Sequence, residues 1–267
     1  MTDPQRSIVV AYKWAADPQE ATVAADGRVD FSRATAVVSD YDAVAIAVGR
    51  RLADDLGAVL VGVTVGGPDA ARPKATKAAL ARGLDRVVVV EAPVPPTTGT
   101  ALIARAVAAM VREETGVAAV LTGDSSVDLG AKTVPTVIGG VLGWPTLTDA
   151  TGVDPLDGGL RVERTTPEGR QRIRIEGPAV VAVATDAATP RAPGMKDVLA
   201  AGKKPAVVRA GGDLGLAPGA AVTVRATRRL SGPERRGIRI AAEDPASAAV
   251  ALVAALRSDG LLEGAHR

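Results

Sequence analysis

The sequence predicts an α/β protein with a doubly wound, mostly parallel sheet, followed by a C-terminal arm. Short runs of Val, Ile and Ala alternate with longer segments whose apolar residues recur at helical spacing. The short runs are apolar on both faces, as in parallel strands that helices cover from each side. Of the 267 residues, 47% are hydrophobic but only 2% are aromatic, so Ala, Val, Leu and Ile must build the core.

The first half of the chain supplies the alternation of strands and helices. The expected strands span residues 8–12, 59–65, 86–90 and 117–122. The expected helices span residues 42–56, 70–82 and 100–114. Gly57 and Gly83 end the first two helices, because glycine readily adopts the left-handed conformation that closes a helix. Asp26-Gly27 predicts a hairpin in the polar segment from Asp17 to Val38.

The segment from Val117 to Pro145 predicts a binding site. An apolar strand ends in Gly123, a polar loop follows over 124–128, and a helix is expected over 129–142. The start of a helix presents free backbone N–H groups, which bind anions. In a doubly wound sheet, ligands also bind beyond the carboxyl ends of the strands, near the point where the strand order reverses. The sequence therefore predicts a nucleotide or phosphate site here, next to the loops at 11–17 and 64–68.

The second half departs from the parallel pattern. Two alternating segments around Pro167-Glu168-Gly169 predict an antiparallel hairpin over 160–175, and an apolar strand follows at 180–184. A short helix is expected over 195–201 within a loop at 185–201. Beyond Pro205 the chain is irregular until a helix at 245–257, with Asp244 as its N-cap. We therefore expect an α/β domain over 1–204 and an arm over 205–267 that packs on another surface.

The composition excludes several classes of chemistry. The chain has no cysteine, which excludes disulfides, thiolate nucleophiles, Cys-ligated zinc and iron–sulfur clusters. Its single histidine, His266, stands beside the C-terminus, which argues against histidine catalysis and a metal site. The G-x-G-x-x-G, G-x-x-x-x-G-K-[ST] and G-x-S-x-G motifs are missing. We expect no catalytic residues, and a binding or carrier protein.

Charge and hydropathy bear on partners and location. The formal net charge is +2, and Arg and Lys are scattered among Asp and Glu, which argues against nucleic-acid binding. No apolar run is long enough to span a bilayer, and no leader pattern is found, so we expect a cytoplasmic protein without membrane insertion.

Several segments, in order, resemble one known family. They are VVAYK (9–13), SDYDA (39–43), TKAALARGLD (76–85), the stretch 123–145 that ends in Trp144-Pro145, VER (162–164), GPAVV (177–181), Pro190-Arg191, KKP (203–205) and GDLG (212–215). The stretch 123–145 aligns without a gap on the pattern G-x-x-x-x-D…N-x-T-G-Q…G-x-L-x-W-P. Along nearly its whole length, the chain is similar to the beta subunit of electron transfer flavoprotein.

This resemblance implies a fold and a set of partners. The fold would be of the Rossmann-like, adenine-nucleotide alpha-hydrolase-like type. An alpha subunit would hold most of the FAD, and the C-terminal arm would pack on it. The heterodimer would shuttle electrons from flavin dehydrogenases, typically acyl-CoA dehydrogenases, to a membrane quinone reductase. The beta subunit would bury an AMP.

The resemblance also implies site residues. The cofactor-binding positions would be Ala11, Ser39, Asp40, Tyr41, Asp42, Val65, Gly123, Asp124, Ser125, Ser126, Val127, Asp128, Lys132, Thr133 and Val134. The positions that dock a dehydrogenase would be Pro193, Gly194, Met195 and Lys196. Ala11 would meet the AMP through its backbone, Tyr41 would replace a phenylalanine close to the flavin ring, and Met195 would replace a docking leucine. No metal ligand is implied.

The chain departs from the family where the AMP phosphate would bind. The pattern N-Q-T-G-Q is replaced by Lys132-Thr133-Val134-Pro135-Thr136, so Val134 lacks a hydroxyl and Pro135 lacks a backbone donor. Either Lys132 compensates with its charge and Thr133 or Thr136 with a hydroxyl, or the AMP site has been lost. A second FAD, as in electron-bifurcating relatives, has no support in this loop. These departures favour a specialised paralogue. The alternative is a nucleotide-binding sensory module similar to universal stress proteins, without a redox role.

Overall fold

The computed structural model describes residues 6–92, 99–215, 230, 232, 236–241 and 244–262. Its contacts divide the chain into one unit over 1–228 and a second over 229–267. The strands are β1 (Ser7–Ala11), β2 (Trp14–Ala16), β3 (Thr22–Val23), β4 (Val29–Asp30), β5 (Ala36–Val38), β6 (Val59–Gly66), β7 (Arg86–Glu91), β8 (Val117–Gly123), β9 (Thr146–Leu156), β10 (Gly159–Thr166), β11 (Gly169–Glu176), β12 (Ala179–Val183) and β13 (Ala206–Ala210). The helices are α1 (Asp40–Leu56), α2 (Pro68–Ala71), α3 (Pro73–Leu80), α4 (Thr100–Glu113), α5 (Val134–Leu142), α6 (Met195–Ala201) and α7 (Pro245–Ser258).

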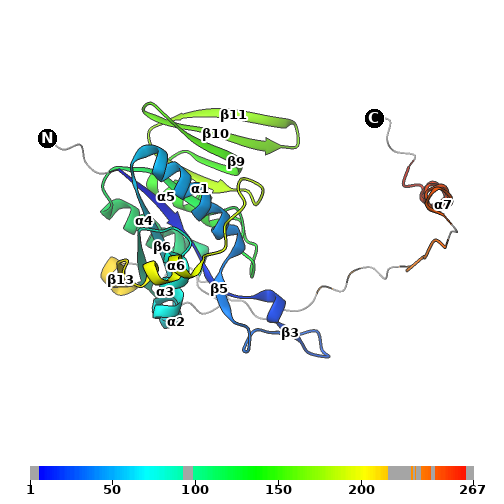
Figure 1. Cartoon of the computed structure of the whole chain (residues 1–267), viewed down its shortest axis with the longest axis horizontal. Helices are drawn as coiled ribbons and strands as arrows, with labels where there is room; N and C mark the ends of the chain where they lie inside the picture. The colour runs from blue at the N-terminus through cyan, green and yellow to red at the C-terminus, as the bar shows by residue number, and fades with distance from the viewer. Residues whose placement is uncertain are drawn as a thin grey trace. The chain divides into compact units, whose positions relative to one another are not determined.

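A nine-stranded sheet organises the first unit, in the order β11-β10-β9-β12-β8-β1-β6-β7-β13 (Figure 1). Strands β12, β8, β1, β6, β7 and β13 run parallel to their neighbours, whereas β10 pairs antiparallel with β9 and β11. The chain passes from β1 to β6 and β7, then returns to the other side of β1 with β8. The strand order therefore reverses between β1 and β8, which confirms the predicted doubly wound, mostly parallel α/β fold.

Alternating side chains of the strands build a core on each face of the sheet, because successive residues of a strand point to opposite sides. Ile8 and Val10 of β1 belong to the cluster that α1 and α3 cover. Val9 and Ala11 belong to the cluster that α4 and α5 cover. The short Val- and Ala-rich strands are thus buried on both sides, as their composition predicts.

Two helices differ from the expected ranges. The helix expected over 70–82 is broken into α2 and α3, because Arg72 precedes Pro73 and adopts an extended conformation (φ −64°, ψ 147°). The helix expected over 129–142 begins only at Val134, since Gly130 and Lys132 take left-handed φ angles of 59° and 53°. The loop after β8 is therefore five residues longer than the prediction.

Four strands among the described residues were not predicted from the sequence: β2 and β5, which pair with each other, and β9 and β13 of the main sheet. Strand β9 contains Thr, Asp, Gly and Pro and lacks an apolar run, yet it pairs with both β12 and β10. Strand β13 lies in the segment expected to be irregular, but it pairs in parallel with β7 at the edge of the sheet. The sheet thus extends beyond residue 204, where the arm was expected to begin.

Other local predictions are confirmed. Strands β3 and β4 form the hairpin expected around Asp26-Gly27, with Gly27 at φ 79°. Strands β10 and β11 form the hairpin expected over 160–175. In the second unit, the Asp244 carboxylate accepts the N–H groups of Ala246 and Ser247 and caps α7. None of the helices in the described ranges is long and apolar enough to cross a membrane.

Candidate functional site

The candidate site lies at the carboxyl ends of β1 and β8, where the strand order reverses. Ala11 pairs with Thr122 and Val63, so β1 ends between β8 and β6. The loop that follows Gly123 and the first turn of α1 meet at this edge. Of the predicted cofactor-binding residues, the structure brings 11, 39–42, 65 and 123–134 to this end of the sheet, which is the position that doubly wound folds use for ligands.

Asp42 joins the ends of the two central strands. Its carboxylate accepts the backbone N–H of Lys13 at 2.8 Å and the backbone N–H of Gly123 at 3.0 Å. The residue is only 5% exposed, and burial raises its pKa to about 7 although the two amides act in the opposite direction. The carboxylate therefore serves the backbone of the site and fixes the spacing of β1 and β8.

Gly123 permits the close approach of α1 to the end of β8. A Cβ atom at this position would lie 2.6 Å from the Cβ atom of Tyr41 and 2.8 Å from its carbonyl carbon. Any larger residue would push the first turn of α1 away from the strand. The glycine that ends the apolar run thus has a packing role in addition to its place in the loop.

Lys13 is a site residue that the sequence analysis did not select. Its Nζ atom contacts both carboxylate oxygens of Asp128, at 2.6 and 2.9 Å. Burial by itself would raise the pKa of Asp128, but the hydrogen bond and charge of Lys13 hold it below its ordinary value. The position of a lysine directly after the first strand was the available signal, because the carboxyl end of a central strand faces the ligand edge.

A second ion pair closes the start of α5. The Nζ atom of Lys132 lies 3.2 Å from Oδ2 of Asp124, and this hydrogen bond and charge raise the pKa of the lysine. The Asp124 side chain is 12% exposed and the Lys132 side chain 59% exposed. Lys132, the basic residue of this segment, is therefore already paired with an acid of the same loop.

The two threonines of this segment are also engaged within the chain. The Thr136 hydroxyl donates to the carbonyl oxygen of Thr133 at 2.8 Å. The Thr133 hydroxyl lies 3.5 Å from the hydroxyl of Thr100. Pro135 has no N–H to offer at the helix start. All polar side chains from 132 to 136 thus have partners inside the protein, and this arrangement does not fit a phosphate unless a partner is displaced.

Three hydroxyl groups lie on segments that end at this edge: Tyr12 follows β1, Thr64 is in β6 and Ser39 precedes α1. Ser39, Tyr12 and Thr64 are buried, and their hydroxyl oxygens have no hydrogen-bond partner among the described residues. Ser39 precedes α1 but makes no side-chain cap hydrogen bond. Because buried hydroxyls are normally paired, these groups suit the hydroxyl or amine of a ligand, or ordered water.

The four predicted docking residues lie on a different element, at the start of α6. Met195 is 80% exposed, and Val198 and Leu199 of the same helix are also exposed. The Asp197 carboxylate accepts the N–H of Gly194 at 2.8 Å and pairs with Arg191 at 2.8 Å, which holds the loop and the helix together. The apolar side chains are therefore presented from an ordered turn.

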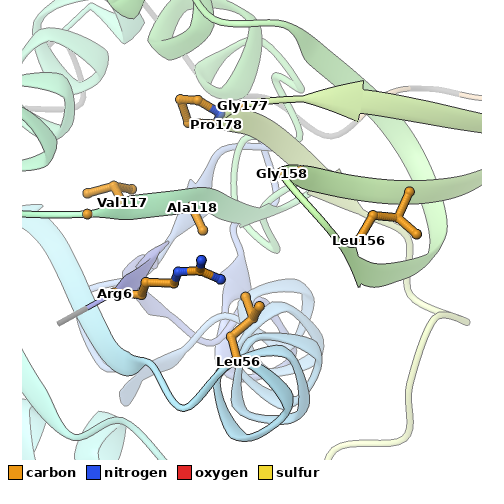
Figure 2. A pocket seen from close by; sticks show the side chains of 10 residues that line it. Arg6, Leu56, Val117, Ala118, Leu156, Gly158, Gly177 and Pro178 are labelled. Atoms are coloured by element: carbon orange, nitrogen blue, oxygen red, sulfur yellow. The ribbon is translucent and has the colours of Figure 1, made fainter. Parts of the chain in front are cut away.

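A hollow of about 360 Å³ lies at the opposite end of the sheet (Figure 2). Leu56, Val117, Ala118, Leu156 and Pro178 line it, with Arg6 as its one charged lining residue. Apart from Arg6, its lining among the described residues consists of apolar residues and glycines, so we place the site at the carboxyl ends of the strands instead. Within the ranges that the structure describes, no three acidic, cysteine or histidine side chains gather to hold a metal ion.

Comparison with protein families agrees with this architecture. The model of the electron transfer flavoprotein domain matches residues 27–213, more than two thirds of the chain. The match begins in the β3–β4 hairpin and ends just after β13, so it includes α1, the loop after β8 and α6. The chain therefore belongs to the electron transfer flavoprotein domain family.

Proposed function

We propose that this chain is the beta subunit of a heterodimeric electron transfer flavoprotein. In this role it carries electrons from flavin dehydrogenases, of which acyl-CoA dehydrogenases are our first candidates, to a quinone reductase. The FAD, held mainly by an alpha subunit, supplies the electron-transfer chemistry. This chain contributes no catalytic residue; it orients the cofactor and binds the partners.

The main support for a heterodimer comes from the apolar side chains of helix α7. Within the second unit, none of its residues is buried, and Val250 and Leu252 are 71% and 47% exposed. Val250 and Val253 are three residues apart, so they share one face of the helix. Apolar surface gains about 25 cal/mol for each Å² removed from water, which favours a covering partner. An alpha subunit is the partner expected for this family.

The support for dehydrogenase docking comes from α6. Met195, Val198 and Leu199 expose apolar side chains on a helix that Arg191 and Asp197 anchor to its preceding loop. Methionine adapts its shape to different partner surfaces. We assign Met195 and its neighbours to the transient contact with the dehydrogenase.

For the cofactors, we place Tyr41 beside the flavin ring and a second nucleotide at the carboxyl ends of β1 and β8. Tyr41 is partly exposed in the first turn of α1 and packs against Gly123. The unpaired hydroxyl of Ser39 suits the sugar or base of a nucleotide. The loop 124–133 would face its phosphate.

Co-expression with an alpha subunit tests the heterodimer. We expect a co-purifying complex with the visible absorbance of bound flavin. Val250→Asp should weaken complex formation, whereas Ser258→Asp adds the same charge to an exposed polar position of α7 and should leave it unchanged. If the chain forms no complex with any alpha subunit tested, forms a homodimer and binds ATP tightly, the result would instead support the sensory-module alternative.

Stopped-flow kinetics test the docking surface. Met195→Ala should slow flavin reduction by the dehydrogenase several-fold without releasing flavin. Because Met195 is 80% exposed, the free energy of unfolding should stay within about 0.5 kcal/mol of wild type. Val23→Ala removes an exposed apolar side chain from β3 and serves as the control. Equal reduction rates for Met195→Ala and wild type would remove Met195 from the interface.

A further inference from the structure

We propose that Asp124 controls the ligand choice of the nucleotide site by competing with a nucleotide phosphate for Lys132. In this inference, which rests on the proposed nucleotide pocket, a phosphate binds only after Lys132 leaves Asp124. The chain therefore disfavours AMP relative to an uncharged nucleoside. The relevant contact is the 3.2 Å ion pair between Lys132 Nζ and Asp124 Oδ2.

The balance of charge at the loop supports the competition. Lys13, which follows β1, is bound to Asp128, and Lys132 of the loop is bound to Asp124, so each of these lysines is matched by a carboxylate of the loop. Asp149 adds a further negative charge near Lys132. A phosphate that enters this loop finds the two lysines already neutralised by carboxylates. It binds Lys132 only if its electrostatic attraction to the lysine exceeds that of Asp124.

The geometry shows which partner moves. Asp124 directly follows β8, its backbone N–H donates to the Val183 carbonyl at 3.1 Å, and its side chain is 12% exposed. Lys132 has a side chain that is 59% exposed and a backbone in the left-handed region, at φ 53°. In the proposed exchange, the long and largely exposed lysine side chain moves, while the more buried aspartate stays in place.

Asp124 also holds the positive charge of Lys132 next to the segment 132–136. Val134 has no side-chain hydroxyl and Pro135 has no backbone N–H to offer a phosphate. Lys132 is the charged donor of this segment. Because Asp124 holds that charge in the resting protein, loss of the acid should convert the loop into a better phosphate site.

Calorimetric titration of the full chain tests this inference, with AMP and adenosine as probes at one ionic strength. Asp124→Asn should bind AMP about fivefold more tightly than wild type, since one competing ion pair and one repulsive charge are removed. The affinity for adenosine, which has no phosphate, should not change. Asp157→Asn makes the same change of charge in the exposed turn between β9 and β10 and should match wild type with both probes.

A double-mutant cycle separates the action through Lys132 from a general charge effect. In the Lys132→Gln background, Asp124→Asn should gain much less affinity for AMP. An equal gain in both backgrounds, no gain, or no measurable AMP binding by Asp124→Asn would each overturn the proposal. Asp124→Ser provides a second charge-removing variant if the first is unfolded by circular dichroism. The flavin content of the heterodimer is measured separately, so the carrier function is tested independently of AMP binding.

Discussion

Replacement of Asp42 by asparagine should change the pH dependence of folding. The carboxylate is buried between the amides of Lys13 and Gly123, and its pKa is raised to about 7. The asparagine side chain would keep nearly the same shape but would not titrate. Its single carbonyl oxygen can serve only one of the two amides well, so the other loses its acceptor.

The magnitude follows from the pKa difference between the folded and unfolded chains. Unfolded Asp42 loses its proton near pH 3.8, whereas the folded chain keeps it until about pH 7. The folded state thus binds more protons between these values, and the contribution of Asp42 to stability falls as pH rises through this window. From pH 5 to pH 8 the folded group titrates over about two pH units, equivalent to about 2.7 kcal/mol.

Urea denaturation of wild type and Asp42→Asn at pH 5 and pH 8 provides the assay. At pH 5 the variant should be less stable by about 1–3 kcal/mol, because one buried amide is left unpaired. At pH 8 the difference should move by about 2.7 kcal/mol in favour of the variant. Other titrating groups cancel in the comparison. A difference in the free energy of unfolding that is the same at both pH values would refute the assignment of a raised pKa to Asp42.

Two further substitutions test packing and charge. Gly139→Ala should lower the free energy of unfolding, measured by thermal denaturation, by about 1–3 kcal/mol, because its Cβ would lie 1.8 Å from the Thr146 hydroxyl oxygen. Gly140→Ala, which has open space around it in α5, should instead raise the free energy of unfolding by about 0.5–1 kcal/mol. Equal effects at the two glycines would contradict the packing of α5 on β9. Lys13→Met should cost about 0.5–1 kcal/mol by urea denaturation at pH 7, a value reduced by the partial exposure of the pair. Since Lys13 lowers the pKa of Asp128, this cost should be present above about pH 4 and shrink as pH falls below it; a cost independent of pH would argue against the pair.

Local patterns were sufficient for the parallel part of the sheet. Strands such as β7 and β8 are short runs of Val, Ala and Leu, and helices such as α1 and α4 have apolar residues at helical spacing. Each of these elements has apolar residues at the spacing typical of its own type of secondary structure, so its type can be predicted without the rest of the chain.

Strands β9 and β13 lack that local signal. Strand β9 carries Asp149, which has a left-handed φ of 57°, and includes a register shift, so neighbouring strands define it more than its composition does. Strand β13 is half exposed at the sheet edge and depends on its ladder with β7. A strand that forms because of its pairing partner cannot be predicted from its own residues alone, because β propensity depends strongly on context.

The sequence by itself determined the parallel α/β class, the order of the main elements and the loops expected at the ligand edge. Apolar periodicity is a local pattern, and the carboxyl ends of parallel strands joined by helices lie at one edge of the sheet. Only the tertiary structure decided which charges neutralise one another. Lys13 and Asp128 are 115 residues apart, and Asp42 reaches the amides of two separate strands. Those contacts require β1 and β8 to lie side by side in one register, and no local segment of the chain encodes that distance.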